Sequence, residues 1–236
     1  MRRLLALLLC AAAVLCACGA REEADPQPLA EAISDVNGRD ALSGKYTLEM
    51  TFGQNSTLYY AAGDVEWDRA ALTARASFTQ NHLGSSVRCE NVFENGVMKS
   101  IENGGELEVE RDAGELLSKF PYFRLPEYSA QGEGLAAAEN GTATTYTYTM
   151  PDGRAFAESV VGDLYSLVTA IKKPQREKTE YGKVACIIVV RGGTVESARY
   201  EYTVKLFDTP AYSKVYSAPE SEYTVTVKVS AKITYK

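Results

Sequence analysis

The side chains able to do chemistry in this chain are few and scattered. His82 is the only histidine, so a histidine-based zinc site lacks a second ligand, and a Ser-His-Asp arrangement would depend on this one residue. The stretch Asp64–Asp68 has closely spaced carboxylates, but Arg69 stands where a calcium loop needs glycine and Arg75 where it needs a bidentate glutamate. No G-x-S-x-G, glycine-rich phosphate loop or H-E-x-x-H motif occurs. We therefore expect no enzyme, no cofactor and no metal site.

Two of the five cysteines lie in the body of the chain, Cys89 and Cys186. Each is separated from nearby apolar residues by an even number of positions, so it faces the same side of a strand as they do. This pattern predicts that both cysteines are buried. They are either free buried thiols or partners in a disulfide between their strands, which an exported compartment permits. Two cysteines are too few for a disulfide scaffold, so a hydrophobic core must hold the fold together.

The first 17 residues have the organisation of an export signal. Arg2 and Arg3 make a short positive region, and Leu4–Val14 is apolar and uncharged. This apolar run is shorter than the roughly 20 residues that a permanent membrane-spanning helix needs. An ordinary secretory signal or a retained anchor is the alternative interpretation of these features alone.

Leu15-Cys16-Ala17-Cys18 resembles the bacterial lipoprotein box, in which an aliphatic residue and two small residues precede an invariant cysteine. The resemblance implies that residues 1–17 are a signal peptide and that Cys18 carries a diacylglycerol thioether. The protein would then be anchored by its acyl chains on the exported face of a cell membrane, and two such chains give stable attachment. Residues 18–28, polar and rich in proline, are expected to be a flexible tether. Whether the envelope has one membrane or two stays open.

The charge of the chain argues against nucleic acid as a partner. Removing Arg2 and Arg3 with the leader changes the formal charge from −6 to −8. An acidic domain is not attracted to phosphate backbones, and anionic lipid would repel it.

The remaining residues, 29–236, are predicted to form one domain that is mostly β. Leu29, Ala32, Ile33 and Val36 fall at helical spacing, in a helix ending near Gly38 or Gly44. Further helices are predicted at 112–120 and 156–171. Strands are predicted from alternating apolar residues and from hairpin turns such as Asn95-Gly96 and Asn103-Gly104: 45–52, 57–68 (continuous or broken at Gly63), 72–78, 87–93, 97–101, 106–110, 144–150, 183–191, 194–207 and 223–235.

Two segments are predicted to be irregular. Asn81–Ser85 is expected to be a loop that includes His82, and Pro121–Gly141 a long loop. A loop of about 20 residues is uncommon in a compact domain and is often functional or mobile. It is either a plain surface excursion or a lid or partner-binding loop.

The predicted fold class is α+β, a large curved antiparallel sheet (half-barrel) with about three helices on its concave face. Nine or ten strands at roughly 4.8 Å spacing make a sheet about 45 Å wide, and three helices of about 10 Å each cover only part of it. Either the sheet curls until its own side chains fill the gap, or an apolar concavity remains for a ligand or partner.

In element order the chain resembles the half-barrel lipid carriers of the LolA/LolB and LppX/LprG type: lipobox and tether, N-terminal helix, antiparallel meander, helical interruption and long C-terminal strands. The resemblance implies an apolar cavity that shields acyl chains. Its wall in this chain would be Tyr46, Leu48, Met50, Phe52, Val225, Val227 and Val229, which otherwise are simply core. The expected function is binding or carrying an apolar or lipid ligand. The alternative is an envelope structural or protein-interaction lipoprotein with a filled core.

Overall fold

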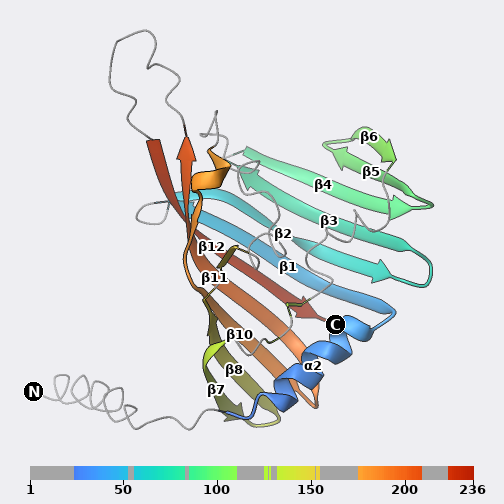
Figure 1. Cartoon of the computed structure of the whole chain (residues 1–236). Coiled ribbons are helices and arrows are strands. Elements are labelled where there is room, and N and C mark those ends of the chain that lie inside the picture. The colour runs from blue at the N-terminus through green and yellow to red at the C-terminus, as the bar shows by residue number, and fades with distance from the viewer. Residues whose placement is uncertain are drawn as a thin grey trace, which may run out of the picture.

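The computed structural model describes residues 24–52, 56–82, 85–110, 125–126, 128, 132–151, 153–154, 175–208 and 223–236. These residues form one antiparallel sheet of 12 strands (Figure 1), whose order is β6-β5-β4-β3-β2-β1-β12-β11-β10-β8-β7 with β9 paired to β11. The elements are α2 (Gln27–Gly38), β1 (Ala41–Phe52), β2 (Ser56–Asp68), β3 (Thr73–His82), β4 (Ser85–Glu94), β5 (Val97–Glu102), β6 (Gly105–Glu110), β7 (Glu133–Asn140), β8 (Ala143–Met150), the 3-10 helix η2 (Arg176–Lys178), β9 (Glu180–Tyr181), β10 (Val184–Arg191), β11 (Thr194–Asp208) and β12 (Tyr223–Tyr235).

The last strand, β12, occupies the middle of the sheet. It pairs with β1 on one side and with β11 on the other, and Figure 1 shows it between the meander β1–β6 and the group β7–β11. Its strict alternation explains this place, because Val225, Val227 and Val229 are at most 4% exposed while the alternate residues Thr224, Thr226 and Lys228 are exposed.

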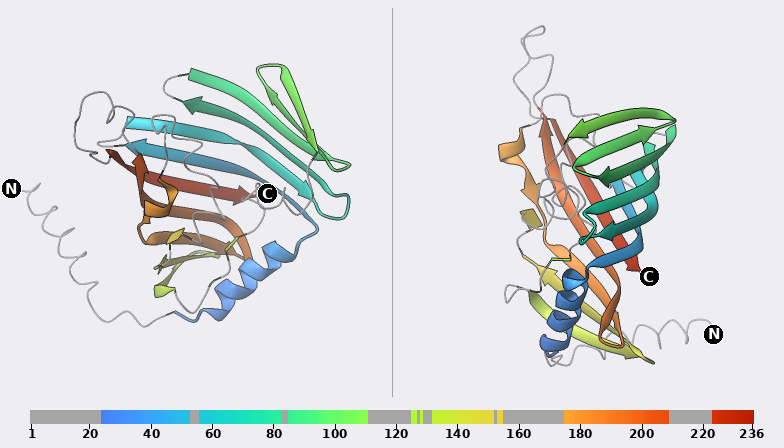
Figure 2. Two further views of the ribbon diagram at one scale, coloured as in Figure 1. Left: turned by 45° about the horizontal axis from the view of Figure 1, so that its top comes forward. Right: turned by 90° about the vertical axis from the view of Figure 1, so that its right-hand side faces the viewer.

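The sheet is curved and twisted (Figure 2), and its two faces differ in chemistry. We call the face that carries the buried side chains the inner face and the opposite one the outer face. Cross-strand pairing places the inner-face residues of neighbouring strands beside one another. For example, Met50 lies between Val229 of β12 and Tyr59 of β2. The outer face carries charged pairs such as Arg75–Glu90, at 2.5 Å.

Helix α2 packs on the inner face, against β11. Its helical spacing is as predicted, since Leu29, Ala32, Ile33 and Val36 are buried and belong to the same core as the sheet. It begins with Pro28 in its first turn, a position where proline costs no hydrogen bond, and ends at Gly38, the earlier of the two predicted ends. The amide of Asn37 holds Leu125 over this core: Asn37 Nδ2 donates to Leu125 O, and Leu125 N donates to Asn37 Oδ1, both at 2.8 Å.

The described part of the chain is predominantly β and holds one α-helix longer than a turn, α2, so the expectation of about three helices is met only in part. The helices predicted at 112–120 and 156–171 lie outside the described residues. The large antiparallel sheet is confirmed.

Three local predictions are wrong. The segment 121–141 is not irregular throughout, because β7 (Glu133–Asn140) pairs with β8. The loop expected at 81–85 is shorter, because β3 continues to His82 and β4 begins at Ser85. Strand β2 is not broken at Gly63, which pairs with Tyr46 and Phe78. In each case, cross-strand pairing extends a strand where the local sequence indicated an end.

The disulfide alternative is also wrong. Cys89 lies on β4 and Cys186 on β10, and both are free and buried. Six strand spacings separate β4 from β10, which is about 29 Å at roughly 4.8 Å per spacing, whereas bridged Cα atoms are about 6 Å apart. The prediction of buried free thiols is confirmed.

Candidate functional site

The predicted wall residues lie together on the inner face, on the neighbouring strands β1 and β12. Six of them are at most 4% exposed and belong to the main core: Tyr46, Leu48, Met50, Val225, Val227 and Val229. Phe52 is on β1 opposite Val227, but its side chain lies outside what the structure describes. The predicted lipidation residue Cys18 also lies outside the described residues.

Rows of apolar side chains cross the inner face from β8 to β2. One row begins at Tyr148 and passes through Cys186 and Tyr200 to the middle of the sheet. It continues through Ala231 and Leu48 to Ala61. Because side chains in one row are direct cross-strand neighbours, the wall predicted on two strands is part of a much wider apolar surface.

The phenols and thiols of this surface are held in their neutral forms. Burial raises the pKa of Cys186 to about 12, and it raises the pKa of Tyr148 and Tyr200 well above the ordinary value. Toward β4, burial together with the nearby Cys89 and Glu102 raises the pKa of Tyr59 to about 12. A low-dielectric surface disfavours phenolate and thiolate, so at neutral pH these groups offer hydrogen bonds rather than charge or nucleophiles.

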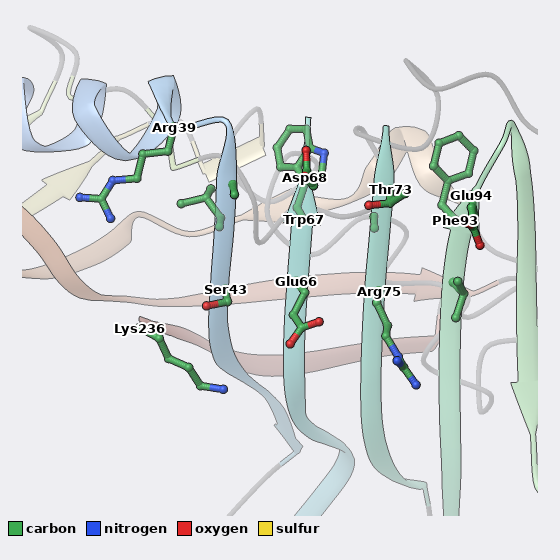
Figure 3. Close-up of a pocket in the computed structure, with 14 residues that line it drawn as sticks. Arg39, Ser43, Glu66, Trp67, Asp68, Thr73, Arg75, Phe93, Glu94 and Lys236 are labelled. Atoms are coloured by element: carbon green, nitrogen blue, oxygen red, sulfur yellow. The ribbon is translucent and has the colours of Figure 1, made fainter. Parts of the chain in front are cut away.

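A hollow of about 490 Å³ lies where the neighbouring ends of β1–β4 meet Arg39 and Lys236 (Figure 3), and residues of both faces of the sheet line it. Leu42, Trp67, Ala74 and Phe93 line it, and they form one cross-strand row from β1 to β4. All four are nearly buried, with Trp67 the most exposed at 9%. These four inner-face side chains are the main apolar part of the lining, and we call them the floor of the hollow.

Charged side chains surround this floor. Arg39, Arg75 and Lys236 line the hollow together with Glu66 and Asp68, and Figure 3 shows Ser43, Glu66 and Arg75 in a row across β1, β2 and β3. Each cation also pairs with a carboxylate that does not line the hollow: Arg39 with Asp35 at 2.7 Å, Arg75 with Glu90 at 2.5 Å, and Lys236 with Asp64 at 3.2 Å. The rim is polar and of mixed sign.

Trp67 is held in place from the turn that follows it. The Arg69 guanidinium lies 4.5 Å from the centre of the indole ring, a contact that attracts the cation to the ring face. Arg69 N donates to Asp40 O at 2.7 Å, which ties this turn to the chain between α2 and β1. The indole is therefore a fixed part of the floor.

Sequence reasoning did not assign these floor residues to a site. Their alternation marks them as inner-face positions, as it does for the predicted wall, and this signal was available on each strand. What the sequence did not indicate is that the ends of four strands meet Arg39 and Lys236 at one place. Of the seven predicted residues none lines this hollow, and Val229 alone lines a second one, of about 550 Å³, whose other residues are mainly polar side chains of β1, β11 and β12 such as Glu49, Arg199 and Lys228.

Within the described residues, no three His, Cys, Asp or Glu side chains are grouped so that they could hold a metal ion. No described helix has the length and apolar character needed to cross a bilayer.

Comparison with known proteins gave structural neighbours only. No family model matches the chain, and no curated protein matches it significantly. Three solved structures are similar over most of their length: lipoprotein LppX from Mycobacterium tuberculosis (14% identity, TM-score 0.46, 90% of this chain and 95% of that chain), LprF from Mycobacterium bovis (13%, 0.42, 91% and 94%) and a LolA superfamily protein from Nitrosomonas europaea (6%, 0.30, 89% and 90%). These neighbours are of the LppX and LolA types that the sequence resembles.

Proposed function

We propose that this chain is a lipid-anchored, exported binding protein that holds an apolar or amphiphilic ligand, a lipid, against the inner face of its sheet. The anchor would be the diacylglycerol thioether of Cys18, and no enzymatic activity is proposed. The observation that carries the proposal is the hollow at the ends of β1–β4, where apolar side chains of the inner face and charged side chains of the outer face line one cavity.

The volume and lining of the hollow support this function. Ligand sites commonly have volumes of about 300–1,000 Å³, apolar walls and a few polar groups, and the hollow has about 490 Å³. Its floor of Leu42, Trp67, Ala74 and Phe93 offers dispersion contacts and burial to a hydrocarbon chain, at about 25 cal/mol per Å² of apolar surface removed from water. The rim of Arg39, Arg75 and Lys236 can contact the polar end of the same molecule.

The distribution of charge supports an acyl chain rather than a charged head as the part held inside. On the described strands every lysine and arginine lies on the outer face or at a strand end, as the register of Lys45, Lys228 and Arg199 illustrates. An anionic head group placed on the inner face would be desolvated without a counter-ion, which is costly. The head group is therefore expected at the rim.

Trp67 provides a direct test, because it is the only tryptophan of the chain and it lines the hollow. The protein, purified without detergent and delipidated, is titrated with a fatty acid brominated on its acyl chain. We expect saturable quenching of the Trp67 emission, because bromine quenches an indole only on close contact. Native mass spectrometry of the undelipidated protein should show bound lipid.

A matched pair of variants separates binding in the hollow from adsorption elsewhere. Ala74→Phe adds a ring at the floor and should abolish the quenching. Ala138→Phe adds the same ring at an exposed position of β7 and should leave the quenching unchanged. Thermal unfolding of both variants checks that they are folded. Equal quenching in the two variants, or none in the wild type, contradicts the proposal.

One observation favours the alternative, an envelope interaction protein with a filled core. The six predicted wall residues whose side chains are described are at most 4% exposed, and Met50 and Val227 are at 0%. In that case the delipidated protein has no site for the fatty acid. A clean apo mass together with no response of Trp67 to the brominated probe would support this function instead.

The anchor has its own test. Cys18→Ala removes the acceptor sulfur, so the protein should leave the membrane fraction and appear in the soluble exported fraction. A variant that stays membrane-bound would contradict lipidation of Cys18, whatever the ligand experiments show.

A further inference from the structure

The chain is fixed to the edge of the sheet at Ala24, within the segment 18–28 that was expected to be a tether. Ala24 N donates to Leu135 O at 3.1 Å, and Leu135 belongs to the edge strand β7. Ala24 also packs against the main core. From Ala24 onward the expected tether is therefore held on the sheet, and α2 begins three residues later.

This contact limits how far the sheet can stand from an anchored Cys18. Six residue steps separate Cys18 from Ala24, and at no more than about 3.6 Å per step they span at most about 22 Å. The sheet is wider than this reach, because ten spacings of roughly 4.8 Å separate β7 from β6 along the surface of the sheet. One edge is thus kept near the lipid while the other is free of it. Figures 1 and 2 place α2, β7 and β8 at one end of the molecule and β4–β6 at the other.

The outer face at the tethered end has an uncharged surface. Two cross-strand rows of three residues define what we call the uncharged patch: Ala136, Thr147 and Ile187 in one row, and Ala138, Thr145 and Val189 in the other. Ala138 and Thr147 are exposed, and the other four are partly exposed.

Ion pairs close the uncharged patch at its two ends. Lys183 pairs with Glu133 at 2.7 Å, and Arg191 pairs with Glu196 at 2.9 Å. On the rest of the outer face, charged residues such as Lys45, Arg75 and Lys99 alternate with carboxylates. Small apolar and hydroxyl side chains can lie at a lipid head-group layer without the desolvation of charge that the remaining outer face would require.

We infer that the end of the sheet formed by β7, β8 and β10 is the membrane-facing end, with the uncharged patch against the lipid surface that holds the Cys18 acyl chains. The opposite end, β3–β6, points away from that membrane. The inference rests on the proposed anchor at Cys18 but not on any ligand.

Two exposed threonines on the outer face give a matched pair of reporters. Thr147 of β8 lies in the uncharged patch, and Thr79 of β3 lies six spacings away, about 29 Å at roughly 4.8 Å each. Thr147→Cys or Thr79→Cys is made in the full chain, and the lipidated protein is labelled with a thiol-reactive fluorophore. Cys89 and Cys186 are buried, so they compete little for the label. Each protein is reconstituted into phosphatidylcholine vesicles that contain head-group nitroxide lipid, which quenches only nearby fluorophores.

We expect several-fold stronger quenching at position 147 than at position 79. Inserting about 15 flexible glycine and serine residues between Glu23 and Ala24, enough to release the sheet from the surface, should reduce the quenching at position 147 to the level at position 79. Equal quenching at the two positions, stronger quenching at 79, or no effect of the insertion overturns the inference. Vesicle flotation separates the premises: protein that does not float with the vesicles contradicts the anchor itself, and protein that floats without the expected difference contradicts the orientation alone.

Discussion

The amide of Asn37 is predicted to contribute measurably to stability. Asn37→Ala removes two hydrogen bonds of 2.8 Å that join the last turn of α2 to both backbone groups of Leu125. Leu125 is 2% exposed and belongs to the core, so its N–H and C=O lose partners where water has limited access. An unsatisfied buried polar group costs about 1–3 kcal/mol. Because Asn37 itself is only half-buried, water compensates in part, and we expect a loss of about 2 kcal/mol in the free energy of unfolding.

Urea unfolding followed by circular dichroism measures this loss, and in a domain of this size it lowers Tm by about 5 °C. Asp35→Ala on the same helix is the matched control. It breaks the ion pair between Asp35 and Arg39, in which both side chains are partly exposed. Such surface pairs contribute about 0–1 kcal/mol to stability. Asn37→Asp keeps the acceptor for Leu125 N and loses the donor to Leu125 O, so its stability should lie between those of the wild type and Asn37→Ala. If Asn37→Ala loses no more stability than Asp35→Ala, the reasoning is refuted.

Three further outcomes follow from close contacts and burial. Gly44→Ala places a Cβ 2.6 Å from a backbone oxygen of β12, whereas Gly38→Ala meets nothing within 4 Å; urea titrations should show a loss of about 1–3 kcal/mol for the first, the usual range for overpacking, and no comparable loss for the second. Cys89 and Cys186 should react slowly with a thiol reagent at pH 8 and at once in urea, because burial raises both pKa values; rapid native reaction would contradict their burial. Folding favours the neutral phenol of Tyr59, so its contribution to stability is complete below pH 10 and is lost as pH rises toward its folded pKa of about 12; stability that stays constant across this window in urea titrations would contradict the raised pKa.

The alternation of apolar and polar residues was sufficient to predict the strands in which both faces carry residues of high β propensity. In β12, valines alternate with threonines and lysines, and the hairpin turns at Asn95-Gly96 and Asn103-Gly104 have the positive φ angles that such turns need. Strand β7 was missed because its sequence, Glu-Gly-Leu-Ala-Ala-Ala-Glu-Asn, has low intrinsic β propensity. Pairing with β8 and the contact with Ala24 hold it in the sheet, and neither is visible in the local sequence.

The sequence predicted an apolar surface on one face of the sheet, but it did not predict where on the sheet the hollow lies. The parity of Leu48 and Val227 predicts that they face the core. Their adjacency with the strands that line the hollow depends on the order of strands in space, which parity does not give. The same gap explains the two thiols, because Cys89 and Cys186 have equivalent local patterns, and only the strand order shows that five strands lie between theirs.

The central place of β12 imposes an order on the assembly of the sheet. It follows every other strand in the chain, yet it joins β1 to β11. Until residues 223–235 take their place, the edges of β1 and β11 that they join are both unpaired. Unpaired strand edges can pair with the wrong partner, so the two halves of the sheet are open to mispairing until the final segment arrives.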